Sequence, residues 1–180
     1  MKQAKALIDK YYSDDHKARE ILIAHGIQVS NKALWIVQKN PHLKVNTEKL
    51  VRAAMLHDIG ILFTNAPDIG CNGAHPYICH GYLGRELLER EGLKDIALIA
   101  ERHTGTGLSM EDIKSKDLPI PHRDMLPVTI EEQIICFADK FYSKGKNSEQ
   151  EIPLEKIRRK LAKHGPNQLE RFDKWCEMFL

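Results

Sequence analysis

The residues with the clearest capacity for chemistry are histidines and aspartates that interrupt apolar stretches of the chain. His57 and Asp58 stand in the run Ala-Met-Leu-His-Asp-Ile-Gly, and Asp139 stands in Ile-Ile-Cys-Phe-Ala-Asp-Lys. A carboxylate buried in such a run is costly unless a cation or hydrogen bonds compensate its charge. The candidate ligand set, in chain order, is His25, His57, Asp58, His80, His103 and Asp139.

The make-up of this set predicts a metal centre that hydrolyses phosphate esters. Imidazole and carboxylate ligands together favour Mn, Fe, Co, Ni or Zn over Mg or Ca. The two oxygens of Asp58 can bridge two cations, and cations about 3.5–4 Å apart share a hydroxide and clamp a phosphoryl group. Taken singly, His25, His80 and His103 are each more simply explained as core or capping histidines. The prediction therefore rests on the joint pattern.

Helices are the elements that must position these side chains, and apolar periodicity predicts them nearly everywhere. A long helix is expected from a cap on Asp14 or Asp15 to about Lys39, because its apolar positions recur every three or four residues. Asn46 or Thr47 is expected to cap the next helix. Further helices are predicted over 2–12, 77–91, 93–103, a short stretch after Ser109 with a weak Asp112 capping box, 129–144 with a Thr129/Glu132 capping box, 153–164 and 166–179.

The remaining segments are predicted as turns and loops. Gly60 is expected to close the helix that carries His57, as a left-handed C-terminal residue does. Residues 61–76 are predicted as a loop, 117–128 as an ordered loop or a mobile lid, and 144–150 as a polar turn. No stretch shows the alternation of a β-strand. We therefore predict an all-α helical bundle with a metal site in its core, forming one domain over 1–180, with a core at about 15–145 and a C-terminal hairpin at about 153–179.

The overall composition adds limits but no specific function. The chain is 42% hydrophobic and 29% charged with a net charge of +2, so a nucleic-acid-binding face is not implied and no nucleic acid partner is expected. Its four cysteines form no Cys-x-x-Cys pair, and its first residues lack the apolar region of a signal peptide. No apolar stretch could span a bilayer. These features predict a cytoplasmic protein without a membrane partner.

With these residues identified, the chain resembles the HD-domain superfamily of metal-dependent phosphohydrolases. The order His…His-Asp…Asp maps onto His25, His57, Asp58 and Asp139, and the sequence carries the His-Asp-Ile-Gly signature of small single-domain members. The resemblance covers roughly residues 15–145. It implies that one divalent metal ion is held by His25, His57, Asp58 and Asp139.

The two histidines between His-Asp and the last aspartate resemble those of the binuclear branches. His80 stands in His-Gly-Tyr-Leu-Gly and His103 in Arg-His-Thr-Gly, contexts similar to those of bacterial HD proteins that hydrolyse diadenosine tetraphosphate symmetrically. The resemblance implies that a second metal ion is held by His80, His103 and the other oxygen of Asp58. The expected substrate is a small phosphorylated compound, most simply a nucleotide.

Departures from related branches bear on the substrate. Branches that hydrolyse cyclic-di-GMP have a lysine after His-Asp-Ile-Gly, whereas Ile61 stands here, and Thr-Gly-Thr-Gly-Leu after His103 lacks both their second histidine and their Gly-Tyr-Pro. The segment 104–128 is longer than in the diadenosine tetraphosphate hydrolases. Because it lies between two predicted ligands, we expect it to shape the pocket, and the substrate stays open.

Two cations are candidates for contact with the substrate phosphate. Lys140 directly follows Asp139, although a solvated helix lysine explains it equally well. Arg123, in the 104–128 segment, is the weaker candidate.

Three other functions stay open at this point. The first is a mononuclear 5′-nucleotidase-like monophosphatase, in which His80 and His103 contact the substrate. The second is a diiron oxygenase, and the third is a nucleotide-binding module without catalysis. A homodimer is also possible, because apolar residues of the last predicted helix pack either on the core, which is the more common case, or on a second copy: Leu169, Phe172, Trp175, Met178 and Phe179.

Overall fold

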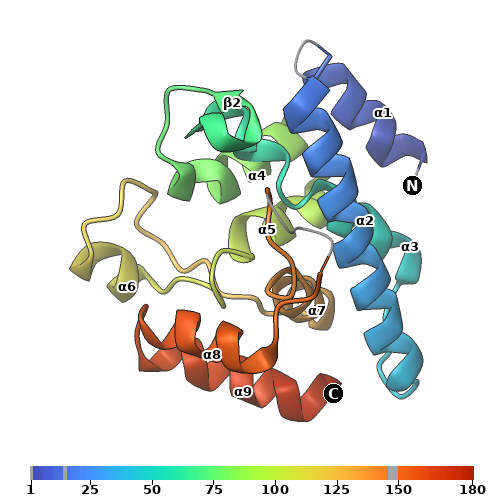
Figure 1. The fold of residues 1–180 in the computed structure, drawn as a ribbon, viewed down its shortest axis with the longest axis vertical. Coiled ribbons are helices and arrows are strands. Elements are labelled where there is room, and N and C mark those ends of the chain that lie inside the picture. Colours follow the sequence, from blue (N-terminus) through green and yellow to red (C-terminus); the bar gives the residue numbers. More distant parts are fainter. Residues whose placement is uncertain (1, 14–15, 146–149) are drawn as a thin grey trace.

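Helices are the main elements of the protein (Figure 1). The computed structural model describes residues 2–13, 16–145 and 150–180. The expected cap at Asp14 or Asp15, and residues 146–149 of the expected polar turn, lie outside the described residues. Within the described part, the structure confirms the prediction of an all-α fold with the histidine and aspartate cluster in its core.

Three helices form the N-terminal part of the fold: α1 (Lys2–Tyr11), α2 (His16–Lys39) and α3 (Thr47–Leu56). The long α2 packs against α3, burying apolar side chains such as Leu22, Val29 and Ile36. Asn46 caps α3, since its side-chain oxygen accepts a hydrogen bond from Lys49 N at 3.0 Å. The apolar face of α2 thus forms one side of the hydrophobic core.

Gly60 has a different role from the predicted one. Helix α3 ends at Leu56, and Gly60 lies within the 3-10 helix η1 (Ile59–Phe63). Its φ is not positive, so it is not in the left-handed conformation. A Cβ on Gly60 would lie 2.1 Å from His80 O and 2.4 Å from Gly84 N. The prediction of a left-handed cap is therefore wrong: the glycine allows two backbone segments to approach closely.

The segment predicted as a loop over 61–76 contains a small antiparallel hairpin. Strand β1 (Asn65–Ala66) pairs with β2 (Cys71–Asn72), with the 3-10 helix η2 (Pro67–Ile69) between them. These two-residue strands are too short to show an alternating pattern, so they agree with the absence of a longer strand and leave the fold all-α. A further 3-10 helix, η3 (Tyr77–Cys79), leads into the next α-helix.

The central helices follow the predicted order with one clear difference in length. Gly92, with φ of 76°, separates the fourth and fifth helices as expected. The helix predicted over 129–144 ends at Asp139, after which the backbone makes three-residue turn bonds, such as Tyr142 N to Asp139 O at 3.2 Å, in place of α-helical ones. The bounds of the four helices are α4 (His80–Arg90), α5 (Lys94–Arg102), α6 (Met110–Ser115) and α7 (Ile130–Asp139).

The two predicted capping boxes differ in their completeness. At the start of α6, the Ser109 hydroxyl accepts from Asp112 N, and the Asp112 carboxylate accepts from Ser109 N, so the weaker prediction is the complete box. At α7, Thr129 accepts from Glu132 N. The Glu132 carboxylate instead accepts a hydrogen bond from Val128 N at 2.6 Å and forms an ion pair with Arg102.

The segment between His103 and α7 is ordered around a small core of its own. Leu108 and Met125 exchange two backbone hydrogen bonds, at 3.0 and 2.8 Å. Their side chains pack in a buried cluster distinct from the main core. This packing favours the ordered-loop interpretation over the mobile lid. The cluster consists of Cys79, Leu108, Ile113, Ile120 and Met125.

The C-terminal hairpin consists of α8 (Leu154–Ala162) and α9 (Pro166–Phe179), which lie side by side at one end of the molecule (Figure 1). Phe172 and Phe179 of α9 are buried against Phe137 of α7, with ring centroids 5.1 and 5.4 Å apart. Much of the apolar face of α9 therefore packs inside its own chain, and a homodimer stays a prediction. None of the described helices has the length and apolar character needed to cross a membrane.

Helix α9 also holds the loop that follows His103. The Gln168 side chain accepts hydrogen bonds from Thr106 N at 2.6 Å and from the Thr106 hydroxyl at 3.0 Å, and it donates to Gly107 O at 2.6 Å. Arg171 donates to Thr106 O and Gly107 O, both at 3.0 Å. Because Gln168 is buried, these bonds fix the loop against α9.

Candidate metal centre

The structure brings the six predicted ligands together in one buried cluster. Each of them is no more than 8% exposed. Most lie at helix ends, where the side chain can reach the space that several helices enclose. Their positions are the middle of α2 for His25, the residues after α3 for His57 and Asp58, the first residue of α4 for His80, the residue after α5 for His103 and the last residue of α7 for Asp139.

Four of these side chains form the first group, whose ligand atoms all lie within 4.8 Å of one another: His25, His57, Asp58 and Asp139. The Nε2 atom of His25 lies 2.9 Å from Asp139 Oδ1 and 3.2 Å from Asp58 Oδ2. The Nε2 atom of His57 lies 3.0 Å from Asp58 Oδ2 and 3.4 Å from Asp139 Oδ1. Two imidazoles and two carboxylates therefore converge on one point.

The second group consists of Asp58, His80 and His103. The Nε2 atoms of His80 and His103 lie 3.5 and 3.4 Å from Asp58 Oδ1, and 3.0 Å from each other. Asp58 thus offers one oxygen to each group. This is the arrangement needed for a carboxylate that bridges two cations.

Backbone carbonyls orient three of the four imidazoles. Nδ1 of His57 lies 2.7 Å from Ala54 O, and Nδ1 of His103 lies 2.7 Å from Ala100 O. His80 makes the same contact, at 2.6 Å, with the carbonyl three residues before it. Since a carbonyl only accepts, each Nδ1 carries a proton, and in the neutral form of each ring Nε2 has its lone pair facing the cluster. This is the usual orientation of a histidine that binds a metal.

The buried polar atoms of the cluster fit a divalent metal. Within the described part of the chain, His57 Nε2 and Asp58 Oδ1 are buried without a hydrogen-bond partner, whereas Asp58 Oδ2 is paired with a lysine. The lone pairs of His80 and His103 point at each other at 3.0 Å. Buried acceptors in this arrangement repel one another unless a cation or proton lies between them. The donor set, nitrogen with carboxylate oxygen, suits Mn, Fe, Co, Ni or Zn.

The two groups differ in their protonation without metal. Burial by itself lowers the pKa of His57, but the Asp58 and Asp139 carboxylates outweigh this effect and raise that pKa to about 9. Burial, together with the neighbouring His103 imidazole, lowers the pKa of His80 to about 3. The first group therefore holds a proton at neutral pH, whereas the imidazole of His80 in the second group is neutral.

Lys144 is a member of the site that sequence reasoning missed. Its Nζ lies 2.6 Å from Asp58 Oδ2, and its side chain is only 14% exposed. Burial opposes the charged form of Lys144, but Asp58, Tyr77 and Asp139 outweigh it and raise the pKa of the amine. In the sequence Lys144 begins the expected polar turn, where it is indistinguishable from a solvated lysine.

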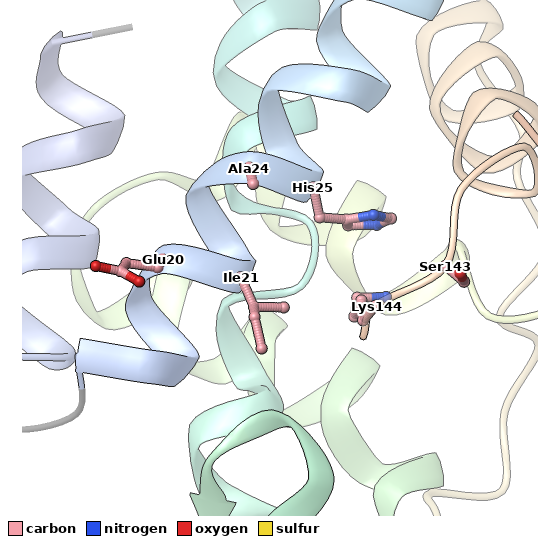
Figure 2. A pocket seen from close by; sticks show the side chains of 6 residues that line it. All are labelled: Glu20, Ile21, Ala24, His25, Ser143 and Lys144. Atoms are coloured by element: carbon pink, nitrogen blue, oxygen red, sulfur yellow. The ribbon is translucent and has the colours of Figure 1, made fainter. Parts of the chain in front are cut away.

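A surface pocket leads to this lysine and to the first group. It is lined by Glu20, Ile21, Ala24, His25, Ser143 and Lys144. Figure 2 shows His25 on α2 and Lys144 on the segment after α7, the two elements that border the pocket. The pocket therefore gives access to the cluster between these two elements.

The two cations predicted to contact substrate are both paired with carboxylates. Lys140 Nζ lies 2.7 Å from Asp139 Oδ2 and 3.0 Å from His103 O, so it links the two groups. Arg123 pairs with the buried Glu101, which also binds Arg85 at 2.6 Å. A contact of Lys140 or Arg123 with substrate stays a prediction.

Similarity to other proteins is consistent with this geometry. The sequence matches the HD domain family over residues 22–143. An uncharacterised protein of Methanocaldococcus jannaschii is 33% identical over 151 residues, which cover 82% of this chain and 82% of that protein. No solved structure matches the chain at a significant level.

Two further relatives are longer proteins named tRNA (cytidine(56)-2'-O)-methyltransferase. The one from Picrophilus torridus is 35% identical over 127 residues, which cover 70% of this chain but 33% of that protein. The one from Thermoplasma volcanium is 26% identical over 170 residues, which cover 94% of this chain and 44% of that protein. The chain thus spans less than half the length of these two relatives. From the family match, which covers more than half of the chain and includes every residue of the cluster, we conclude that this protein belongs to the HD domain family.

Proposed function

We propose that this protein is a metal-dependent phosphohydrolase that acts on a small nucleotide or a related phosphate ester. The observation that carries the proposal is the pair of adjoining ligand groups that share Asp58. Membership of the HD domain family, whose members are generally metal-dependent hydrolases, supports the same reaction class. A dinucleoside polyphosphate such as diadenosine tetraphosphate is the first substrate to test.

The proposed assignment of ligands follows the two groups. His25, His57, Asp58 and Asp139 would hold one divalent ion, and His80, His103 and the second oxygen of Asp58 would hold the other. Bound divalent ions supply a water nucleophile of lowered pKa and neutralise charge on the phosphoryl group.

The chain's own residues provide orientation and charge. The carbonyls of Ala54, Tyr77 and Ala100 fix the three imidazoles that they bind. Lys140 neutralises Asp139 and connects it to the backbone beside His103.

The test combines metal content with a substrate screen. The natural protein is purified without added metal or chelator, and its metal content is compared with that of Asp58→Ala and of His164→Ala, whose histidine is exposed. We expect Asp58→Ala to lose metal and hydrolysis together, since both groups use this carboxylate. The screen covers dinucleoside polyphosphates, phosphodiesters and nucleoside monophosphates. An Asp58→Ala protein that keeps full metal content and activity would overturn the proposal.

The metal count also separates the proposal from its rivals. A single ion that is unchanged in His80→Ala, with hydrolysis of monophosphates alone, would indicate a mononuclear monophosphatase. Iron together with oxygen consumption would indicate an oxygenase. Tight nucleotide binding without turnover at any metal would indicate a binding module.

A second candidate substrate is a phosphate ester in RNA. It is favoured by the two relatives whose names refer to tRNA methylation and which contain a segment similar to this chain. The same centre would then act on a terminal or cyclic phosphate of an RNA. Short RNA oligonucleotides with 3′-phosphate or 2′,3′-cyclic phosphate ends belong in the substrate screen, and lack of turnover on them would reject this candidate.

A further inference from the structure

Lys144 occupies an unusual place beside the first ligand group. Its Nζ lies 2.6 Å from Asp58 Oδ2, the same oxygen that lies 3.0 Å from His57 Nε2 and 3.2 Å from His25 Nε2. A protonated amine has no lone pair, so it cannot be a metal ligand. The ammonium therefore lies where it compensates the carboxylate, close to the point on which the first group converges.

This position is favourable only while the first group holds no divalent cation. A buried carboxylate needs a compensating positive charge, and Lys144 provides it at ion-pair distance. A divalent ion bound to the same carboxylate oxygen would supply that charge instead. It would also repel an ammonium a few ångströms away, in surroundings that screen charge poorly.

The fold gives Lys144 a route away from Asp58. Helix α7 ends at Asp139, so Lys144 lies in an irregular segment rather than on a helix. The next residue, Gly145, has φ of 119° and nothing within 4 Å of the position of a Cβ. Lys144 also lines the surface pocket, so its side chain can turn from the cluster toward the pocket opening (Figure 2).

The other charged groups near the pocket do not share this property. Lys140 Nζ is held by both Asp139 Oδ2 and His103 O and is absent from the pocket lining. Glu20, at the pocket, points away from His25 and Lys144 in Figure 2. Among the residues that line the pocket, Lys144 is the cation available to an incoming anion.

We propose that Lys144 alternates between two partners: it neutralises Asp58 in the metal-free protein, and once metal is bound it turns into the pocket and binds the phosphate group of the substrate. The identity of the anion as a phosphate ester rests on the proposed function. The displacement of the side chain by metal does not. Lys144 is thereby a substrate-binding residue whose availability depends on the loading of the centre.

The first test uses the natural protein and the reactivity of its lysine amines. Reductive methylation of Lys144 is followed by mass spectrometry in the metal-free protein, with Mn²⁺, and with Mn²⁺ plus inorganic phosphate. We expect the rate at Lys144 to rise at least about fivefold with Mn²⁺ and to fall again with phosphate, because the amine leaves the carboxylate and then meets the anion. Lys32, which pairs with Glu151 and has a side chain only 10% exposed, serves as the half-buried reference, and Lys163, which is exposed, as the surface reference. A Lys144 rate that neither Mn²⁺ nor phosphate alters would overturn the proposal.

The second test compares Lys144→Met with Lys163→Met by calorimetry. In Lys144→Met we expect Mn²⁺ to bind at least about fivefold more tightly, because no ammonium competes for Asp58. We expect inorganic phosphate to bind the Mn²⁺-loaded variant at least about tenfold more weakly, because a charge-assisted contact is lost. Lys163→Met should match the natural protein in both. Should Lys144→Met fail to fold, Lys144→Gln replaces it, and unchanged phosphate affinity in the folded variant would contradict the proposal.

These readouts separate the two proposals. If no phosphate ester is hydrolysed but Lys144→Met shows both expected changes, the proposed function fails and the role of Lys144 stands. If the natural protein hydrolyses a nucleotide while Lys144→Met binds Mn²⁺ and phosphate unchanged, the proposed function stands and the role of Lys144 fails.

Discussion

His80 and His103 face each other through their Nε2 atoms at a distance of 3.0 Å, and each has its Nδ1 proton engaged by a backbone carbonyl. Two neutral imidazoles in this arrangement direct lone pairs at each other. The contact is favourable only with a cation or a proton between them, and the pKa of His80, lowered to about 3, argues against a proton there at neutral pH. The pair therefore offers two converging nitrogen ligands that could hold a metal ion.

The first prediction concerns the number of metal ions. His80→Ala removes one of the two imidazoles of the second group and leaves the first group intact. We expect the metal content, by elemental analysis, to fall from about two transition-metal ions to about one per chain. The exposed His164, changed to alanine, is the control. Equal metal content in His80→Ala and the natural protein would contradict the assignment of His80 as a ligand.

The second prediction concerns thermal stability after removal of metal. A ligand that binds only the folded chain at a hundredfold excess over its Kd stabilises it by about 2.7 kcal/mol. For a domain of this length we therefore expect Mn²⁺ to raise the Tm of the chelated protein by about 5–10 °C in calorimetry. Asp58→Ala should show no such rise, because both groups lose their shared oxygen.

The third prediction concerns pH. His57, with its pKa raised to about 9, is protonated at pH 7 in the metal-free protein, whereas a metal binds only the neutral ring. Metal binding must therefore release that proton. We expect the apparent affinity for the metal to rise with pH by up to about tenfold per pH unit, as far as about pH 9. Calorimetry in two buffers of different ionisation enthalpy measures the release. Binding heats that do not depend on the buffer would count against it.

The fourth prediction concerns Gly60. In Gly60→Ala the new methyl group would lie 2.1 Å from His80 O and 2.4 Å from Gly84 N, so the backbone of α4 must shift. We expect a loss of about 2–3 kcal/mol or more in the free energy of unfolding, measured with urea on metal-free protein. Gly92→Ala is the matched control: it has φ of 76° but open space, so it should lose only about 1 kcal/mol. Equal losses in the two variants would show that crowding at Gly60 is unimportant.

The fifth prediction concerns Gln168. Gln168→Ala leaves Thr106 N, which donates at 2.6 Å, without its buried acceptor, and leaves Gly107 O with the bond from Arg171 alone. We expect a loss of about 2–4 kcal/mol in unfolding free energy. We also expect weaker binding of the second metal ion, because the loop continues directly from His103. The exposed Asn167, changed to alanine, is the control, and a Gln168→Ala protein with both properties intact would refute the role of this residue.

Much of the site could be predicted from the sequence because its members are chemically unusual in their surroundings. Asp58 and Asp139 stand in apolar stretches, where a carboxylate needs compensation, so their presence indicated a cluster. The helices that carry them were predicted from periodicity, which depends only on local sequence.

The parts that could not be predicted depend on tertiary contacts. Lys144 has no unusual local context, and its position follows from the end of α7 at Asp139 and from Asp58, which is distant in the sequence. The role of Gly60 depends on the approach of α4, which a local pattern does not encode. The pairing of Arg123 with Glu101 depends on the fold of the 104–128 segment in the same way.

The bonds from Gln168 and Arg171 to the loop after His103 have a consequence for the extent of the functional unit in this chain. Both residues lie beyond the matched segment, which ends at residue 143. The backbone that follows the candidate ligand His103 is therefore held by helix α9, which lies outside the segment that matches the family. A change in α9 would therefore alter how the loop after His103 is held without changing any candidate ligand. A chain shortened to residues 22–143 would keep all six candidate ligands but lose these hydrogen bonds.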